Sequence, residues 1–315
     1  MKILITGAAG NLGTFICRHL LAGPYQLKLM IHQRQPSTEI LRAPNVKFFR
    51  ADLGETKTLY NACQDTDCII HLAGILFAPQ PEKFLPTTNL TYVQNLVTAA
   101  LATNVKKFIL ISFPHVEGES TPHKPALGQL AGRPDSVHAQ TRLAAEKHIF
   151  AASQDSSMVA VSLRPGMIYA RGVLMIDAAR WLLKHRLMGV WRKPTWIHLL
   201  SLPDFLRSVQ MAIDKNETAG IYNLGDDRPL TLQDFLDRAA RQWGYPPPWR
   251  APQWSFFLAA WCVETYARLF QTSSPLTRDF IRIGMASYVM DTSRMKSELL
   301  PNLTYPSLDE GISLL

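Results

Sequence analysis

A glycine-rich segment near the start of the chain has the composition and spacing of a phosphate-binding loop. Residues 6–13 have the sequence TGAAGNLG, directly after a short apolar run and at the start of a helical pattern. The first glycine of such a loop allows a tight turn, the middle one lets the backbone approach a pyrophosphate, and the last lets helix and strand pack closely. We therefore expect Gly7, Gly10, Asn11, Leu12 and Gly13 to bind a dinucleotide. The alternative is a glycine-rich turn that binds no ligand.

The end of the second apolar run carries the residues that choose between two dinucleotides. An Asp or Glu there binds the adenosine ribose hydroxyls of NAD, whereas an Arg accommodates the 2′-phosphate of NADP. Residues 27–37 contain no acidic residue but do contain Arg34, with Arg18 and His32 as further basic candidates. Because a guanidinium pairs well with a phosphate, we predict NADP (or NAD) as the cofactor, with NADP preferred. The alternative is that Arg34 is an ordinary solvated loop residue.

The elements that must position this loop alternate between two patterns in the first half of the chain. Apolar runs predict strands at residues 2–6, 27–32, 46–49, 68–72, 107–112 and 158–163. Helical patterns lie between them at residues 12–21, 55–63, 90–104 and 138–152. Such alternation is typical of βαβ units. It predicts an α/β fold with a doubly wound, mainly parallel sheet (Rossmann-type), whose cleft lies at the carboxyl ends of the strands.

The pattern changes after residues 164–166, where longer helical stretches predominate. They cover residues 174–185, 203–213, 232–243 and 254–270, with a short apolar run at 221–224. We expect residues 1–165 to form the dinucleotide-binding domain, completed by part of 190–230. Residues 166–315 would then form mainly a smaller C-terminal substrate lobe, interleaved with the main domain.

Composition excludes several classes of protein. The 315 residues are 47% hydrophobic, which excludes a disordered chain, and the excess of 33 Lys and Arg over 25 Asp and Glu gives a net charge of +8. This charge permits anionic partners, but basic runs interleaved with aromatic residues are lacking, so we expect no nucleic-acid partner. The four cysteines form no C-x-x-C pair. They exclude a disulfide scaffold, fit a reducing compartment, and lead us to expect a cytoplasmic protein.

Taken in order, further motifs resemble the extended short-chain dehydrogenase/reductase family, which comprises NAD(P)-dependent epimerases, dehydratases and reductases. The resemblance covers nearly the whole chain and rests on the glycine loop, residues 52–53, 71–74 and 164–169, Asn89, the segment 197–205 with Asp204, and residues 222–225. It implies the fold expected above and a small-molecule substrate. It also implies cofactor contacts from a further set of residues: Asp52, Leu53, Leu72, Ala73, Gly74, Pro165, Gly166 and Ile168.

The catalytic positions of that family are altered in this sequence. The family uses a Tyr and, four residues later, a Lys on one helix face, with a Ser or Thr after the fifth strand. Here His138 and Arg142 stand at the Tyr and Lys positions, and Ser112 is the nearest hydroxyl, although the usual hydroxyl position falls nearer Phe113 or Pro114. Residues at i and i+4 share a helix face. Histidine exchanges protons near neutral pH, and Arg142 would supply a fixed charge for substrate, ribose or phosphate.

Two functions follow from this departure. In the first, the protein is an atypical oxidoreductase or epimerase that acts on a small carbonyl or hydroxyl compound, with His138, Arg142 and Ser112 as catalytic residues. In the second, it is a catalytically silent nucleotide-binding sensor or scaffold. The family resemblance also implies a homodimer that forms through two helices, one of which carries the His138–Arg142 pair.

Two other groups of residues have alternative interpretations. His115, Glu117, Glu119 and His123 lie close in sequence but lack the spacing of a metal site, so we expect no metal there. Arg164 and Arg171 would contact an anionic substrate or form ordinary ion pairs. The aromatic-rich segment 254–270 would line a pocket, rest on a membrane, form a dimer contact or pack onto the main domain. Because its polar members form no basic face, we expect packing onto the main domain, with membrane contact as a minor alternative.

Overall fold

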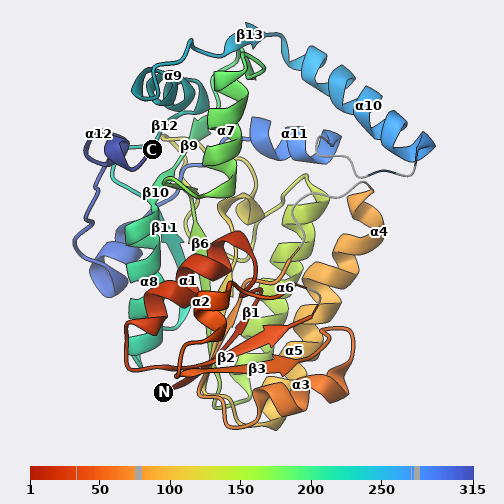
Figure 1. Cartoon of the computed structure of the whole chain (residues 1–315), viewed down its shortest axis with the longest axis vertical. Helices are drawn as coiled ribbons and strands as arrows, with labels where there is room; N and C mark the ends of the chain where they lie inside the picture. The colour runs from red at the N-terminus through yellow and green to blue at the C-terminus, as the bar shows by residue number, and fades with distance from the viewer. Residues whose placement is uncertain (33, 75–79, 271, 273–276) are drawn as a thin grey trace.

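The computed structural model describes residues 1–32, 34–74, 80–270, 272 and 277–315 of the chain. Its centre is a seven-stranded sheet in which all neighbouring strands run parallel (Figure 1). The strands, in order of sequence, are β1 (Lys2–Thr6), β2 (Gln26–Ile31), β3 (Val46–Arg50), β4 (Cys68–His71), β5 (Lys107–Ile111), β6 (Val159–Pro165) and β11 (Gly220–Leu224). Their order across the sheet is β11-β6-β5-β4-β1-β2-β3. The predicted doubly wound parallel sheet is therefore confirmed.

The chain reverses its direction of travel across the sheet at β1. It first moves outward from β1 to β2 and β3, then returns to the other side of β1 with β4 and continues to β5, β6 and β11. At such a reversal the loops after neighbouring strands turn to opposite faces, which opens a crevice at the carboxyl ends. The glycine loop follows β1 directly, so it lies at this crevice.

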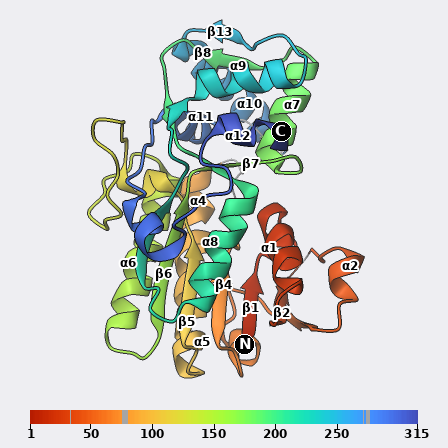
Figure 2. The same ribbon diagram turned by 90° about the vertical axis from the view of Figure 1, so that its left-hand side faces the viewer.

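Helices cover both faces of the sheet and bury two separate apolar layers (Figure 2). One face carries α1 (Asn11–Leu21) and α8 (Leu202–Asp214), which contact each other. The opposite face carries α3 (Thr56–Cys63), α5 (Tyr92–Ala102) and α6 (Val137–Gln154). Every residue of β4 and β5 is buried, which is why these strands are almost continuously apolar rather than alternating.

A smaller set of elements lies beyond the carboxyl ends of the strands, at the upper end of the molecule in Figure 1. Three two-stranded ladders form part of it: β7 (Met167–Tyr169) with β10 (Leu199–Ser201), β9 (Trp196–Ile197) with β12 (Leu230–Thr231), and β8 (Gly189–Trp191) with β13 (Trp249–Ala251). Its helices are α7 (Leu174–Lys184), α9 (Leu232–Gln242), α10 (Gln253–Leu269), α11 (Arg278–Met285) and α12 (Leu308–Gly311). Strand β11 leaves this region and joins the main sheet beside β6.

Several helical segments depart from the sequence-based expectation. The helix expected at residues 90–104 begins earlier, with α4 (Pro81–Leu85) and a π-helical turn over Pro86–Thr91 ahead of α5. Pro81 stands at the first helical position, where its missing N–H removes no intrahelical bond. Helices α2 (Thr38–Leu41), α11 and α12 were not predicted. Helices α2 and α12 have only four residues each, too few to show a period.

Candidate functional site

The glycine loop is packed too closely to admit side chains. Gly7 has φ +74°, and a Cβ on it would lie 2.8 Å from the backbone N of Ala73. A Cβ on Gly13 would lie 2.1 Å from the carbonyl O of Gly7. The start of α1 has no side-chain cap among the described residues and no acidic residue in its first turn. Its amide groups therefore remain available, and the cradle fits the pyrophosphate of a dinucleotide.

Asn11 connects this loop to the smaller region of the molecule. Its Nδ2 donates to the Gly172 carbonyl at 2.8 Å, and its Oδ1 accepts from the Leu174 backbone N–H at 2.9 Å. The Asn11 side chain is therefore occupied by the turn that leads into α7, and its backbone amide is the group left for a phosphate. Leu12 is half-buried and packs against the core beside α1.

The end of β2 carries the residues expected to discriminate between cofactors. His32 Nδ1 lies 3.9 Å from Asp52 Oδ2, while Asp52 Oδ1 accepts from the Gly54 backbone N–H at 2.8 Å. Arg18 is paired with Glu39 of α2 at 3.1 Å. Arg34 is exposed and forms no ion pair within the part of the chain that the structure describes. Among these basic residues, Arg34 is thus the free guanidinium.

The remaining expected cofactor residues line the carboxyl ends of their strands. Ala73 lies against Gly7, and Leu72 follows β4 directly. Gly166 follows β6, where a Cβ would lie 2.3 Å from the His198 carbonyl. Two side chains point elsewhere. Ile168 is only 7% exposed and belongs to the main core, and the Leu53 side chain packs against the second apolar layer.

His138 and Arg142 lie one turn apart on the buried face of α6, and they are 7% and 6% exposed. Burial, together with the charge of Arg142 and the neighbouring His115, lowers the pKa of His138 to about 3. Burial also lowers the pKa of Arg142 to about 10, so its guanidinium remains charged at neutral pH. The pair consists of a neutral imidazole and a permanent cation. The His138 ring packs edge-on to Phe113 with centroids 4.9 Å apart.

Several buried polar atoms near this pair find no hydrogen-bond partner among the described residues. They are Arg142 Nε and Nη1, Asn89 Oδ1, His71 Nε2 and Ser112 Oγ. Arg142 and Asn89 converge at Gly74, where a Cβ would lie 3.1 Å from Arg142 Nη2 and 3.8 Å from Asn89 Oδ1. Because buried polar groups are normally paired, this group, which we call the polar cluster, fits a polar ligand.

Ser112 is the least closely connected of the three expected catalytic residues. It directly follows β5, and its backbone N–H donates to the Leu163 carbonyl at 2.7 Å. The described residues provide no hydrogen bond between its hydroxyl and either His138 or Arg142. Its link to the pair runs through the next residue, Phe113, whose ring contacts His138.

His71 is a member of the polar cluster that was recognised from sequence only as part of a turn motif. Its Nδ1 is hydrogen-bonded to the Thr6 hydroxyl at 2.8 Å, which joins the ends of β1 and β4. Burial lowers the pKa of His71 to about 3, and the charge of Arg142 adds to the effect. A buried, neutral His71 therefore lies between the glycine loop and Arg142.

Arg164 forms a buried ion-pair network. Of the two roles considered from sequence, a substrate contact and an ion pair, the structure shows the ion pair. Its guanidinium contacts the carboxylates of both Glu146 and Glu117, and Arg164 and Glu146 are fully buried. Glu117 in turn accepts from the backbone N–H groups of Leu127 and Gly128 at 3.1 and 2.8 Å. The network ties the loop after β5 to α6 and β6, so Arg164 is not available to an anionic substrate.

His115 lies beneath α11, and its Nε2 has a hydrogen-bond partner, whereas its buried Nδ1 has none among the described residues. Its Nε2 donates to the Ile283 carbonyl at 3.1 Å, and burial lowers its pKa to about 4. Within the described ranges, no group of three His, Cys, Asp or Glu side chains is placed to hold a metal ion.

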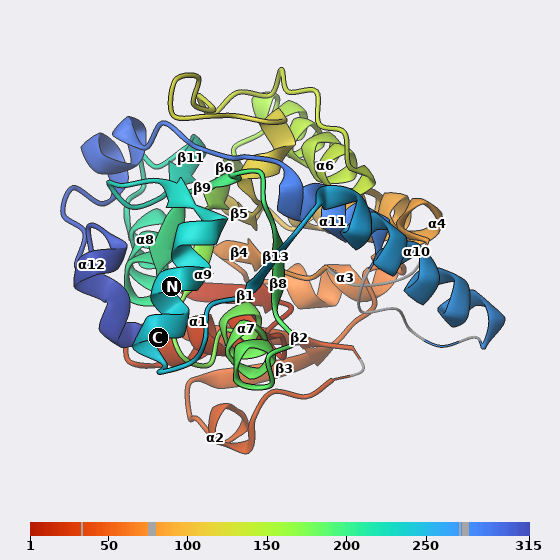
Figure 3. The same ribbon diagram turned by 90° about the horizontal axis from the view of Figure 1, so that it is seen from above.

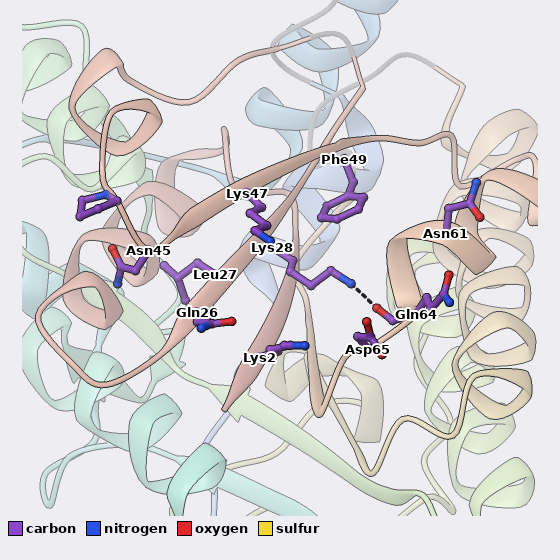
Figure 4. Close-up of a pocket in the computed structure, with 11 residues that line it drawn as sticks. Lys2, Gln26, Leu27, Lys28, Asn45, Lys47, Phe49, Asn61, Gln64 and Asp65 are labelled. Carbon is purple, nitrogen blue, oxygen red and sulfur yellow. Dashed lines mark hydrogen bonds between the residues drawn. The ribbon is translucent and has the colours of Figure 1, made fainter.

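A pocket of about 490 Å³ lies away from the glycine loop, at the amino ends of β1, β2 and β3 (Figure 4). Lys2, Lys28 and Lys47 line it. Lys28 Nζ donates to the carbonyl of Gln64, at the end of α3, and to Thr66 Oγ1. This lysine caps the end of α3, and the pocket takes no part in the cofactor cleft.

Comparison with known proteins identifies a dinucleotide-binding family over most of the chain. The profile of the NAD dependent epimerase/dehydratase family matches residues 3–225. A 2-alkyl-3-oxoalkanoate reductase from Stenotrophomonas maltophilia (strain K279a) is 24% identical, over 99% of this chain and 97% of the relative. A UDP-glucose 4-epimerase from Vibrio cholerae is 23% identical, over 88% of this chain and 84% of its own.

Solved structures share the fold. The UDP-glucuronic acid 4-epimerase from Bacillus cereus in complex with NAD superposes with a TM-score of 0.77 at 21% identity, covering 100% of this chain and 97% of that one. The match of the family profile over residues 3–225 agrees with the glycine loop at the switch point of the sheet. The chain therefore belongs to the NAD dependent epimerase/dehydratase family.

Proposed function

We propose that this protein is an NAD(P)-dependent oxidoreductase or epimerase that acts on a carbonyl or hydroxyl group of a small molecule. The observation that carries the proposal is the His138–Arg142 pair, buried one turn apart on α6 beside the unpartnered atoms of the polar cluster. Such an arrangement supplies a proton-transfer group and a fixed charge at one place.

The proposed chemistry needs only these groups and the cofactor. The bound dinucleotide would supply or accept a hydride at the substrate carbon. A neutral imidazole has one N–H donor and one basic nitrogen, so His138 would take the hydroxyl proton in oxidation and return one in reduction. Arg142 would stabilise the negative charge that develops on the substrate oxygen. Asn89, His71 and Ser112 would orient the polar parts of the ligands.

The free Arg34 supports NADP as the preferred dinucleotide, since it has no carboxylate partner in the described structure and would pair with a 2′-phosphate. For the substrate, the reductase of 2-alkyl-3-oxoalkanoates aligns with nearly the whole chain. It favours a compound with a 3-oxo or 3-hydroxy group over a sugar nucleotide, the substrate named for the epimerase relative.

A second candidate function is that of a silent nucleotide-binding sensor or scaffold. Its support is the packing of His138 against the Phe113 ring, together with a Ser112 hydroxyl that is not linked to the pair. In this function the polar cluster would bind only the cofactor.

One experiment separates the two. Affinities for NADP and NAD are measured by titration calorimetry, and turnover is assayed with a 2-alkyl-3-oxoalkanoate and with UDP-glucose, for the wild type and for His138→Ala. The enzyme proposal expects the substitution to abolish turnover and to leave nucleotide affinity within about twofold, because His138 is expected to act on the substrate rather than on the phosphates. Nucleotide binding with no turnover by the wild type on either class, or full turnover by His138→Ala, would favour the silent function.

We also propose a cytoplasmic homodimer. The four cysteines are free, and three of them are buried, as expected in a reducing compartment. The neighbouring helices α5 and α6 are the proposed contact. Light scattering of the purified protein gives its mass directly, and a monomer at all concentrations would exclude the contact.

A further inference from the structure

Helix α10 exposes an unusually large apolar surface. Trp254, Leu258 and Trp261 are 66%, 51% and 51% exposed, and at its end Leu269 and Phe270 are 74% and 62% exposed. Figure 3 shows α10 extending beyond the rest of the molecule at one side. Contiguous exposed apolar patches of this kind usually mark an interaction site.

Helix α10 has one face that packs on the rest of the protein and a different face that is exposed. Ala260, Glu264 and Ala267 are buried and recur at helical spacing. The Glu264 carboxylate is paired with Arg278 Nε of α11 at 2.8 Å. Trp254, Leu258 and Trp261 recur at the same spacing on another face. The helix is held to the body by Ala260, Glu264 and Ala267, together with Phe256, whose ring packs on Trp191. The side chains of Trp254, Leu258 and Trp261 are the exposed ones.

Basic residues border this apolar face although few of them lie on α10 itself. Lys184, Arg186, Arg192 and Lys193 are exposed and have no ion pair within the described part of the chain. No acidic residue occurs between residues 181 and 193. Strand β8 brings this segment to α10, because it pairs with β13, which leads directly into the helix.

Two contacts place the basic segment at the start of α10. The Arg192 backbone N–H donates to the Ala251 carbonyl at 3.1 Å, two residues before the helix begins. The Trp249 backbone N–H donates to the Met188 carbonyl at 3.1 Å. Trp249 and Leu187 are themselves 51% and 58% exposed. The basic segment and the exposed apolar residues at the start of α10 are therefore neighbours along the backbone. We call these residues together the lobe face: Lys184, Arg186, Leu187, Arg192, Lys193, Trp249, Trp254, Leu258 and Trp261.

We propose that the lobe face docks on an anionic lipid bilayer. The side chains of Trp254, Leu258 and Trp261 would enter the headgroup region, and the bordering lysines and arginines would contact lipid phosphates. Tryptophan is the residue most typical of this interface. None of the helices in the described ranges is both long and apolar enough to cross a membrane, so α10 would lie on the surface.

Charge favours a bilayer over a second copy of this chain. In a twofold dimer the lobe face would meet itself, and the four unpaired cations of each copy would face one another. A bilayer with anionic lipid supplies the opposite charge. The proposal reverses the expectation from sequence, which considered only the polar residues of the segment 254–270. The basic residues come from residues 181–193, about sixty positions earlier, and the β8–β13 ladder unites the two segments.

The test is co-sedimentation of the full chain with vesicles of phosphatidylcholine, with and without phosphatidylglycerol. We expect binding to the anionic vesicles and weaker binding to the neutral ones. Leu258→Glu with Trp261→Glu should weaken binding by more than about tenfold, because two charges replace apolar area. Arg192→Gln with Lys193→Gln should weaken binding to anionic vesicles by about fivefold per residue and leave binding to neutral vesicles unchanged.

A matched control is Phe48→Glu, which changes an apolar residue that is 40% exposed on β3, far from the lobe face. It should bind vesicles like the wild type. Equal binding by the Leu258→Glu/Trp261→Glu variant and the wild type, or no binding by either, would overturn the proposal. So would a dimer in light scattering that this double variant dissociates. Calorimetry with NADP on the same samples shows whether each variant is folded. It also measures cofactor binding independently of vesicle binding.

Discussion

The His138 imidazole and the Arg142 guanidinium share one buried face of α6, a single turn apart. Burial of the ring and the adjacent positive charge both favour its neutral form and hold the pKa of His138 at about 3. The pair therefore differs from a tyrosine and lysine in one respect that can be measured. A tyrosine needs the nearby cation to become a base, whereas this histidine is unprotonated without it.

The first prediction concerns the pH dependence of turnover. Because the proton-accepting form of His138 is lost only as pH falls through about 3, kcat/KM for oxidation should show no inflection from this residue between about pH 5 and 8. The double variant His138→Tyr with Arg142→Lys should instead lose activity as pH falls from the alkaline range. A wild-type inflection near pH 6.5 would contradict the low pKa of His138.

Arg142 should serve both binding and catalysis. Arg142→Ala should weaken NADP binding by about tenfold, the order of one lost charge-assisted hydrogen bond, and should also reduce kcat. Arg142→Lys keeps the charge but not the planar fork, so we expect it to retain more of both. Calorimetry and steady-state kinetics give the two effects separately. Unchanged affinity and kcat in Arg142→Ala would remove the residue from the site.

Arg34 and Arg18 form a matched pair for testing cofactor preference. Arg34 is free in the described structure, whereas Arg18 is paired with Glu39 at 3.1 Å. We expect Arg34→Ala to weaken NADP binding by about tenfold and NAD binding by less than about twofold. Arg18→Ala should change neither by much. Equal affinities of the wild type for both dinucleotides would contradict the proposed role of Arg34.

Two substitutions in the glycine loop should affect different properties: one lowers the stability of the fold, and the other weakens NADP binding. A Cβ at position 13 would lie 2.1 Å from the Gly7 carbonyl, so Gly13→Ala should lower the free energy of unfolding by about 1–3 kcal/mol. Gly10 is exposed, and its Cβ would come no closer than 3.1 Å to the same carbonyl. Gly10→Ala should therefore unfold at nearly the wild-type urea concentration but bind NADP at least about tenfold more weakly. Tight NADP binding by Gly10→Ala would indicate that the phosphates lie elsewhere.

Asp226 should make stability depend on pH. It is 1% exposed, and burial raises the pKa of its carboxyl to about 8. A raised pKa in the folded state favours the protonated form, so stability is complete below the unfolded value of about 4 and is lost as pH rises toward 8. Asp226→Asn mimics the protonated carboxyl. As pH rises over this range, the free energy of unfolding of Asp226→Asn should increase relative to that of the wild type by at most about 1.4 kcal/mol per pH unit. Urea unfolding at several pH values measures this difference. A constant difference between pH 5 and 8 would refute the shift.

The sheet and the glycine loop were predictable because each rests on a short, local pattern. Residues 108–111, for example, are apolar throughout. Within the glycine loop, Gly7 has a positive φ and Gly13 packs against the Gly7 carbonyl. The polar cluster was only partly predictable. Asn89 and His71 were recognised as family motifs, but their convergence with Arg142 depends on side chains from β4, α6 and the π-helical turn.

The lobe face was missed for a similar reason. Its aromatic residues were recognised on one helix, but the basic residues that border them come from a segment that only the β8–β13 pairing places nearby. The buried network of Arg164, Glu146 and Glu117 also joins three distant parts of the chain. Contacts of this kind depend on tertiary packing, which cannot be predicted from the local hydrophobic pattern of the sequence.

The late arrival of β11 at the main sheet has a consequence for synthesis on the ribosome. Strands β1 to β6 are complete by residue 165, but the open edge of β6 is covered only when residues 220–224 have emerged. The covering strand is in turn held from the far end of the chain, since the Tyr222 hydroxyl donates to Glu298 Oε2 at 2.8 Å. The nascent sheet thus passes through a long interval with an unpaired hydrophobic edge, a feature that favours aggregation of incomplete chains. A truncated transcript that ends before this strand would yield a chain prone to aggregation rather than a smaller working domain.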